Sequence, residues 1–189
     1  MMQGSPCKDN KRTLFLDRDG VLNVRPGKSY VVKPGDFHWM EGSLQALVRL
    51  TGLYARIIVV TNQQGIGKGL MNKQQLDDVH AKMLGDAQKA GARIDAVYFA
   101  SGLRHSDSFN RKPSEGMFLK AKKDFPEINA GASVMVGDSF SDILFAYRLG
   151  MTSVLIAKQR SFPLRYHYMA DFQFNNLLLF SDFMIRDDV

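Results

Sequence analysis

The sequence contains little that would place the protein outside a cell or in a membrane. Its single cysteine, Cys7, cannot form a disulfide within the chain, which is typical of a reducing compartment. No apolar run reaches the roughly 20 residues that a membrane-spanning helix needs. The opening segment, MMQGSPCKDNKR, also lacks the apolar stretch of a secretion signal. We therefore predict a cytoplasmic protein that does not associate with membranes.

Low-complexity tracts are absent as well, so nothing in the composition divides the chain. With 189 residues, 45% of them hydrophobic, the chain is long enough to bury a substantial core. We predict a flexible leader over residues 1–12 and a single domain over residues 13–189.

A basic run is missing, although the chain carries a net charge of +6, with 25 Lys and Arg against 19 Asp and Glu. The basic residues are spread along the chain without interleaved aromatic residues. A small phosphorylated substrate explains such a positive field better than nucleic acid does. The sequence leaves the oligomeric state open.

Buried strands alternate with amphipathic helices along most of the chain. Short apolar runs predict strands over residues 13–16, 56–61, 94–100, 133–136 and 152–157, with a short strand over 172–174. Helical spacing of apolar residues predicts helices over residues 42–52, 73–90 and 140–149, and another that opens at Pro113. This alternation is typical of an α/β fold with a mostly parallel sheet flanked by helices.

Two carboxylates follow the first strand, in the stretch TLFLDRDGVLN. Asp17 and Asp19 are costly at the end of a buried strand unless a cation neutralises them, and Mg²⁺ prefers oxygen ligands. Gly20 lets the chain turn away at this point. The alternative is that both aspartates only end the strand and cap a loop.

More polar residues follow the other strands, where ligands bind in sheets of this kind. Thr61 and Asn62 follow the second strand, and Arg111 and Lys112 directly precede a predicted helix. The fourth strand leads into a further group, which comprises Gly137, Asp138 and, one helical turn later, Asp142.

The motifs DRDG, TNQ, RKP and GDSFSD appear in this order on the predicted elements. In this the chain resembles phosphatases of the haloacid dehalogenase (HAD) superfamily over residues 13–157. The resemblance implies a Rossmann-like HAD fold and a Mg²⁺-dependent phosphomonoesterase. DRDGVLN, TNQQGIGKG and RKPSEGM resemble the branch that contains heptose bisphosphate phosphatases and histidinol phosphatases.

The resemblance also implies a role for each polar residue. Asp17 is the expected nucleophile, and Asp19 the general acid and base, with a pKa raised by the neighbouring carboxylate. Thr61 and Lys112 are expected to hold the phosphoryl group, with Lys112 at or near a helix N-terminus. The expected metal ligands are the side chains of Asp17 and Asp138 and the backbone carbonyl of Asp19. Gly137 and Asp142 are expected to support the site, Asp142 by orienting Lys112 or a metal-bound water rather than by binding the metal.

The gaps between the motifs leave no room for a separate cap domain, so the loops should set specificity. The residues expected to bind substrate are Asn23, Tyr30, Asn62, Gln63 and Arg111. Related proteins carry a zinc-binding loop with cysteines before RKP, whereas this chain has Ser108 and Asn110 where the last two would stand. We therefore expect no structural zinc. A heptose 1,7-bisphosphate is the expected substrate; the alternatives are histidinol phosphate, a polynucleotide 3′-phosphate, or a non-catalytic binding domain.

Overall fold

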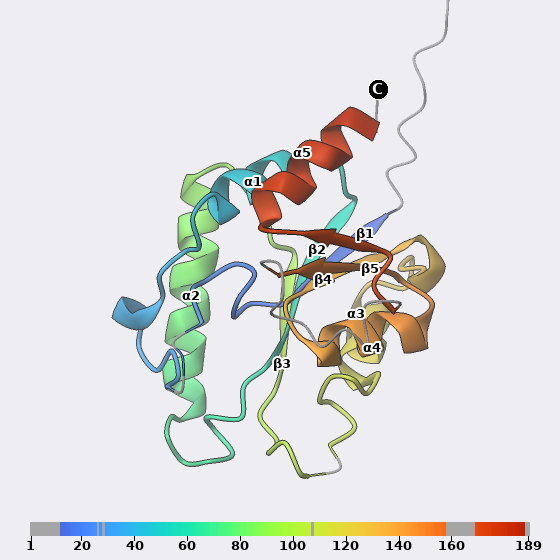
Figure 1. Cartoon of the computed structure of the whole chain (residues 1–189). Helices are drawn as coiled ribbons and strands as arrows, with labels where there is room; N and C mark the ends of the chain where they lie inside the picture. The colour runs from blue at the N-terminus through green and yellow to red at the C-terminus, as the bar shows by residue number, and fades with distance from the viewer. Residues whose placement is uncertain (1–11, 26, 28, 107, 158–168, 188–189) are drawn as a thin grey trace, which may run out of the picture.

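The computed structural model of the chain describes residues 12–25, 27, 29–106, 108–157 and 169–187. Nearly all of the proposed leader, residues 1–11, therefore lies outside the described residues. The described strands form one six-stranded sheet in the order β3-β2-β1-β4-β5-β6, and every pair of neighbours is parallel (Figure 1). The strands are β1 (Thr13–Leu16), β2 (Arg56–Asn62), β3 (Ala96–Ala100), β4 (Val134–Gly137), β5 (Thr152–Ile156) and β6 (Phe172–Phe174).

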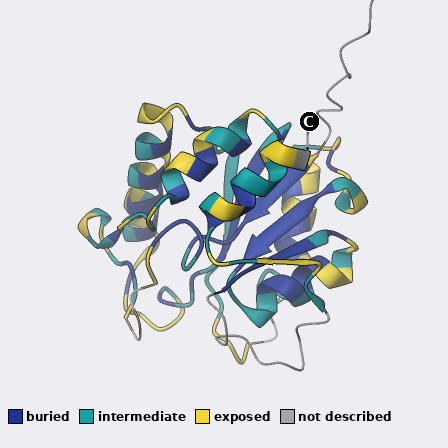
Figure 2. Cartoon of the chain, turned by 45° about the horizontal axis from the view of Figure 1, so that its top comes forward, coloured by how far each residue is buried: buried dark blue, intermediate teal, exposed yellow. Residues whose placement is uncertain are grey.

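The central strands are apolar along their whole length because both faces of the sheet are covered. Leu14 and Leu16 of β1 pack into the core on one face, whereas Phe15 between them packs into the core on the other. Side chains alternate between the two faces of a strand, so each face needs its own helical layer. Figure 2 shows the strands as the buried centre of the molecule, with exposed residues on the outer sides of the helices.

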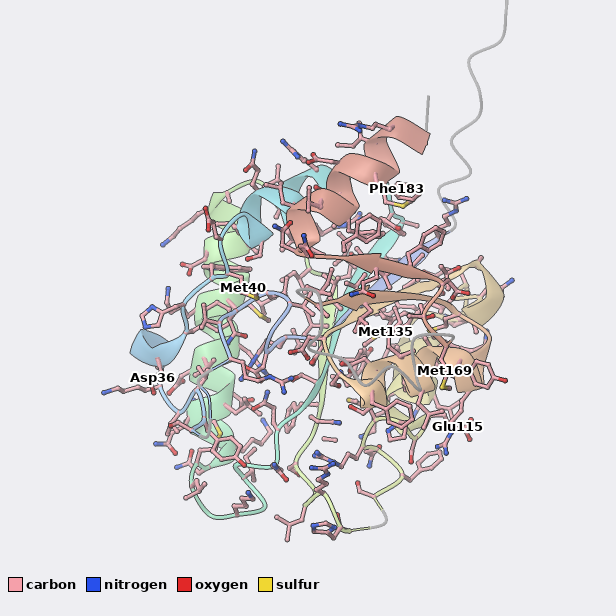
Figure 3. The ribbon with its side chains drawn as sticks, in the orientation of Figure 1. Asp36, Met40, Glu115, Met135, Met169 and Phe183 are labelled. Atoms are coloured by element: carbon pink, nitrogen blue, oxygen red, sulfur yellow. The ribbon has the colours of Figure 1, made fainter. Side chains whose placement is uncertain are left out.

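Two groups of helices provide these layers. Helices α1 (Ser43–Thr51), α2 (Lys73–Lys89) and α5 (Leu177–Asp187) supply the core on one face, and α3 (Gly116–Asp124) and α4 (Phe140–Leu149) supply the other (Figure 1). Two short 3-10 helices, η1 (Pro34–Asp36) and η2 (Ala130–Ala132), lie in connecting loops. Met135 of β4 lies among the central strands, whereas Asp36 of η1 lies at the outer margin (Figure 3). None of the helices in the described ranges combines the length and the apolar character needed to cross a bilayer.

The predicted α/β architecture with a mostly parallel sheet is confirmed. Most of the predicted bounds agree within one residue, and three details differ by more. The third strand begins at Ala96 instead of residue 94, and the helix expected at Pro113 begins at Gly116. Helix α5 was not predicted, although Leu177, Phe180 and Met184 follow helical spacing and pack on the core.

The sheet topology places the carboxyl ends of β1 and β4 next to each other at the centre. From β1 the chain builds outward through β2 and β3, and then returns to form β4, β5 and β6 on the other side. Such a switch point opens a crevice at the carboxyl ends of the strands. Among the described residues, the segments 63–72 and 101–115 contain no helix or strand, and 17–42 contains only η1. No cap domain is therefore inserted at these positions.

Candidate active site

Asp17 is the first residue after β1, and it faces the crevice between β1 and β4. Its backbone N–H donates to the Val136 carbonyl at 2.9 Å, which extends the pairing of the two strands by one residue. Its Oδ1 accepts a bond of 2.8 Å from the Arg18 backbone N–H and lies 2.9 Å from Lys112 Nζ. Burial raises the pKa of Asp17 to about 6, although the Lys112 ammonium lowers it. The carboxylate is therefore desolvated but paired with a cation.

Lys112 is the buried cation of this cluster. Its Nζ lies 2.9 Å from Asp17 Oδ1 and 2.7 Å from Asp142 Oδ1, and it donates to the Val60 carbonyl at 2.5 Å. Burial favours the neutral amine, but the carboxylates of Asp142 and Asp17 outweigh this and raise the pKa of Lys112 above its usual value. Asn62 fixes the Lys112 backbone by donating to its carbonyl at 3.1 Å and accepting from its N–H at 3.0 Å.

Because α3 begins only at Gly116, the expectation that Lys112 directly precedes a helix is wrong. Turns occupy the segment between them, where the Ser114 N–H donates to the Arg111 carbonyl at 2.8 Å and the Gly116 N–H to the Phe109 carbonyl at 3.0 Å. Buried carboxylates, and not the N-terminus of α3, therefore surround the Lys112 ammonium.

Asp142, in the first turn of α4, is fully buried and oriented by its own loop. Its Oδ2 accepts from the Ser139 N–H at 3.0 Å and from the Ser139 hydroxyl at 2.5 Å, which leaves Oδ1 to pair with Lys112. A Cβ on Gly137 would lie 2.1 Å from the Cβ of Asp142, so only glycine fits at the end of β4. Of the two roles expected for Asp142, these contacts favour orienting Lys112.

Asp19 is held by three side chains. Arg18 Nη2 lies 3.0 Å from both carboxylate oxygens, and the amides of Asn23 and Gln63 donate to them at 3.0 and 2.7 Å. Although burial raises the pKa of Asp19, Arg18 and these amides outweigh burial and lower it below its usual value. The expectation of a raised pKa is therefore wrong for this structure, because the neighbouring charge that dominates is a guanidinium and not a carboxylate.

Arg18 was not selected from the sequence, and yet it is fully buried beneath the site. Its Nη1 donates to His80 Nε2 at 3.2 Å, while its Nη2 binds Asp19. Burial and the Arg18 charge lower the pKa of His80 to about 4, so the imidazole is neutral and accepts this bond. Arginine is seldom buried without charged partners. The two aspartates that flank Arg18 in the sequence were therefore the only sign that it could be buried.

Asp138 completes a group of three carboxylates that fits a metal ion. Asp17, Asp138 and Asp142 each offer an oxygen, and these oxygens lie within 4.8 Å of one another. Burial and the Asp17 charge raise the pKa of Asp138 to about 8, as expected for an acid in need of a cation. Gly20, with φ of +94°, passes so close that a Cβ there would lie 1.9 Å from Asp138 Oδ2. An oxygen-rich site of this kind suits Mg²⁺.

The cluster opens into a pocket of about 790 Å³. Its walls include the predicted site residues Asp17, Asp19, Tyr30, Thr61, Asn62, Gln63, Arg111 and Lys112. Arg111 donates to the Gly102 carbonyl at 3.3 Å, and burial and the nearby Arg104 lower its pKa. The Thr61 hydroxyl accepts from the Gln63 amide at 2.9 Å. Arg25 and Arg104 also line the pocket and were not selected from the sequence.

Three residues expected to bind substrate have their side chains committed to the protein. Asn62 bonds the Lys112 backbone, Gln63 bonds Asp19 and Thr61, and the fully buried Asn23 bonds Asp19 and the Val24 carbonyl at 2.9 Å. These contacts position Lys112, Asp19 and Thr61. Their binding of substrate stays a prediction, as it does for Tyr30 and Arg111.

Known proteins share this architecture and sequence. The HAD-hydrolase-like family matches residues 109–177 of the chain. The D-glycero-beta-D-manno-heptose-1,7-bisphosphate 7-phosphatase of Haemophilus ducreyi is 34% identical over 176 residues, which make up 89% of this chain and 95% of that protein. The chain belongs to the HAD-like phosphatases. The resemblance inferred from the four motifs is thus confirmed.

Two further relatives of this HAD-like phosphatase carry similar names. The D-glycero-alpha-D-manno-heptose-1,7-bisphosphate 7-phosphatase of Burkholderia mallei is 37% identical over 156 residues, 79% of this chain and 81% of that protein. The crystal structure of D,D-heptose 1,7-bisphosphate phosphatase from B. bronchiseptica, complexed with magnesium and phosphate, has a TM-score of 0.81 and 25% identity. It covers 93% of this chain and 99% of that one.

Proposed function

We propose that this HAD-like phosphatase removes the 7-phosphate of a D-glycero-D-manno-heptose 1,7-bisphosphate with the help of Mg²⁺. The observation that carries the proposal is the buried Asp17–Lys112–Asp142 contact at the floor of the pocket, beside Asp138. The names of the relatives support the substrate, and they include both the alpha and the beta anomer. A purely binding domain would have no need of a desolvated carboxylate next to a buried ammonium.

In the proposed reaction, Asp17 attacks phosphorus through a carboxylate oxygen, and the bond from phosphorus to the sugar oxygen breaks. Asp19 gives its proton to the departing sugar oxygen, which leaves as a hydroxyl. It then takes a proton from the water that attacks the aspartyl-phosphate, which returns Asp17 and releases phosphate. Lys112 offsets negative charge on the transferring phosphoryl group, and the hydroxyl of Thr61 donates to one of its oxygens.

The side chains of Asp17 and Asp138 and the backbone carbonyl of Asp19 would hold Mg²⁺. When bound, the ion supplies positive charge that offsets the repulsion between a phosphate and the carboxylates. We propose that no structural zinc is needed, because the segment 101–111 contains no cysteine. We also keep the proposals of a single domain over residues 13–189 and of a cytoplasmic location.

The pocket supports a small substrate with a second anionic group. Arg104 and Arg111 both line it, and they lie close enough for the Arg104 charge to lower the pKa of Arg111. A guanidinium binds a phosphate through paired donors. We therefore place the phosphate that is not hydrolysed at these arginines.

The test is a comparison of phosphate release from a panel of substrates in the presence of Mg²⁺. The panel holds both anomers of the heptose bisphosphate, histidinol phosphate, a 3′-phosphorylated oligonucleotide and an aryl phosphate. We expect a heptose bisphosphate to have the highest kcat/KM and Asp17→Asn to abolish turnover of every substrate. Arg111→Ala should raise KM for the bisphosphate and leave the aryl phosphate unchanged.

Two results would contradict the proposal. A higher kcat/KM for histidinol phosphate or the oligonucleotide would reject the substrate, while leaving the chemistry in place. Turnover close to wild type in the Asp17→Asn variant would reject the mechanism. The amide is similar in shape to the carboxylate, so a loss of activity with an unchanged circular dichroism spectrum reports on chemistry and not on folding.

A further inference from the structure

The guanidinium of Arg25 lies on oxygens that we have assigned to the metal. Arg25 Nη2 is 2.7 Å from Asp138 Oδ1 and donates to the Asp19 backbone carbonyl at 3.3 Å. Both oxygens belong to the three-ligand set proposed for Mg²⁺. A side chain of the protein therefore already supplies positive charge at this position.

The charges around the site explain why Arg25 is there. Asp17, Asp138 and Asp142 bring carboxylate oxygens within 4.8 Å of one another. Lys112 pairs with Asp17 and Asp142, and Arg25 pairs with Asp138. Carboxylates this close repel one another unless cations separate them. The two basic side chains thus stabilise the carboxylates while no metal is bound.

Arg25 and a metal ion compete for these oxygens. The Arg25 guanidinium and Mg²⁺ repel each other at short range. The guanidinium would therefore have to move away before Mg²⁺ could bind the oxygens of Asp138 and Asp19. The Arg25 side chain is 51% exposed, whereas the preceding backbone is fixed by the Val24 N–H, which donates to the His38 carbonyl at 2.9 Å. The side chain can therefore turn into the open pocket that it lines without a shift of the Val24 backbone.

We propose that Arg25 is an internal counter-ion of the metal centre, which holds the oxygens of Asp138 and Asp19 in the metal-free enzyme and leaves them when Mg²⁺ binds. The inference rests on the proposed function only in taking Mg²⁺ as the cofactor. Its consequence is specific. A residue that merely organised the ligands would strengthen the binding of Mg²⁺, whereas an internal counter-ion weakens it.

The test is calorimetric titration of Mg²⁺ into the metal-free protein without substrate, at a pH of about 9 so that Asp138 is ionised in every variant. We expect the Kd for Mg²⁺ to fall by about fivefold in Arg25→Gln, the order expected from losing one half-exposed ion pair. Arg25→Lys keeps the charge and should stay within about twofold of wild type. Arg12→Gln is the matched control, because Arg12 is exposed at the opposite end of β1 and its loss changes the net charge equally.

A Kd in Arg25→Gln that equals or exceeds the wild-type value overturns the inference. An equal gain in Arg12→Gln also overturns it, because the effect would then come from net charge. Failure of the proposed substrate is a separate result: an enzyme that ignores heptose bisphosphates and still shows the tighter Mg²⁺ binding in Arg25→Gln rejects the substrate and supports the counter-ion. Thermal unfolding of each variant verifies that the fold is intact.

Discussion

Replacing Lys112 with methionine should destabilise the protein far more than the loss of one surface charge would. Lys112 is 2% exposed, and its Nζ lies 2.9 Å from Asp17 Oδ1, 2.7 Å from Asp142 Oδ1 and 2.5 Å from the Val60 carbonyl. Methionine fills a similar volume with an unbranched chain but offers no charge or donor. Lys112→Met therefore leaves two buried carboxylates and a carbonyl without their cation.

The size of the effect follows from the burial of the cluster. Removing one member of a buried ion pair costs about 3–5 kcal/mol of unfolding free energy. A proton can offset part of this, because burial raises the pKa of Asp17 from 3.8 to about 6 even with Lys112 present. A carboxyl whose pKa is higher in the folded state stabilises that state at low pH, and this stabilisation is lost as the pH rises through the folded value. We therefore expect a loss of about 4 kcal/mol near pH 8 and a clearly smaller loss near pH 5.5.

Urea denaturation with a chelator present measures both values. Lys123→Met is the matched control, because Lys123 is exposed in the last turn of α3 and should cost less than about 0.5 kcal/mol. A loss below about 1 kcal/mol for Lys112→Met near pH 8 would show that the ammonium does not stabilise the carboxylates as argued. An equal loss at both pH values would refute the compensating proton on Asp17.

Two further predictions concern pH. Burial and the Arg18 charge lower the pKa of His80 from 6.5 to about 4 in the folded protein. As the pH falls, the unfolded chain therefore binds a proton on His80 before the folded protein does. The free energy of unfolding of the wild type should thus fall by up to about 3 kcal/mol between pH 6.5 and pH 4. In urea titrations, the free energy of unfolding of His80→Gln should depend less on pH than that of the wild type. The same pH dependence in both proteins would contradict this prediction. Since the pKa of Asp138 is raised to about 8 and a metal ligand must lose its proton, Mg²⁺ should bind more tightly as the pH rises towards 8. Calorimetry showing a pH-independent Kd would reject this link.

Much of the fold was predictable because the strands are continuous apolar runs. Buried parallel strands need no polar face, so segments such as Arg56–Asn62 stand out from their surroundings. The position of the polar residues followed from the same fact, because parallel strands end at one edge of the sheet. Asp17, Thr61 and Asp138 could therefore be assembled from their order in the chain alone.

The parts that sequence reasoning missed depend on distant contacts. The burial of Arg18 relies on His80, 62 residues later in the chain, and no local pattern encodes that pairing. Arg25 contacts Asp138 across 113 residues. At Pro113, the preference of proline for the first turn of a helix suggested a start that the structure does not have. The Gly116 N–H instead donates to the Phe109 carbonyl, and this contact outweighs the local preference of proline for a first helical turn.

The lowered pKa of Asp19 bears on the source of the proton that the proposed mechanism gives to the leaving group. In this structure Arg18, Asn23 and Gln63 stabilise the charged carboxylate, so the resting acid carries no proton at neutral pH. A phosphate dianion that enters the pocket adds negative charge beside Asp19, and like charge raises the pKa of a carboxyl. In the proposed mechanism, protonation of Asp19 is therefore coupled to the arrival of substrate. We propose that Arg18, Asn23 and Gln63 keep Asp19 ionised before substrate binds, and that the negative charge of the substrate then raises the pKa of Asp19.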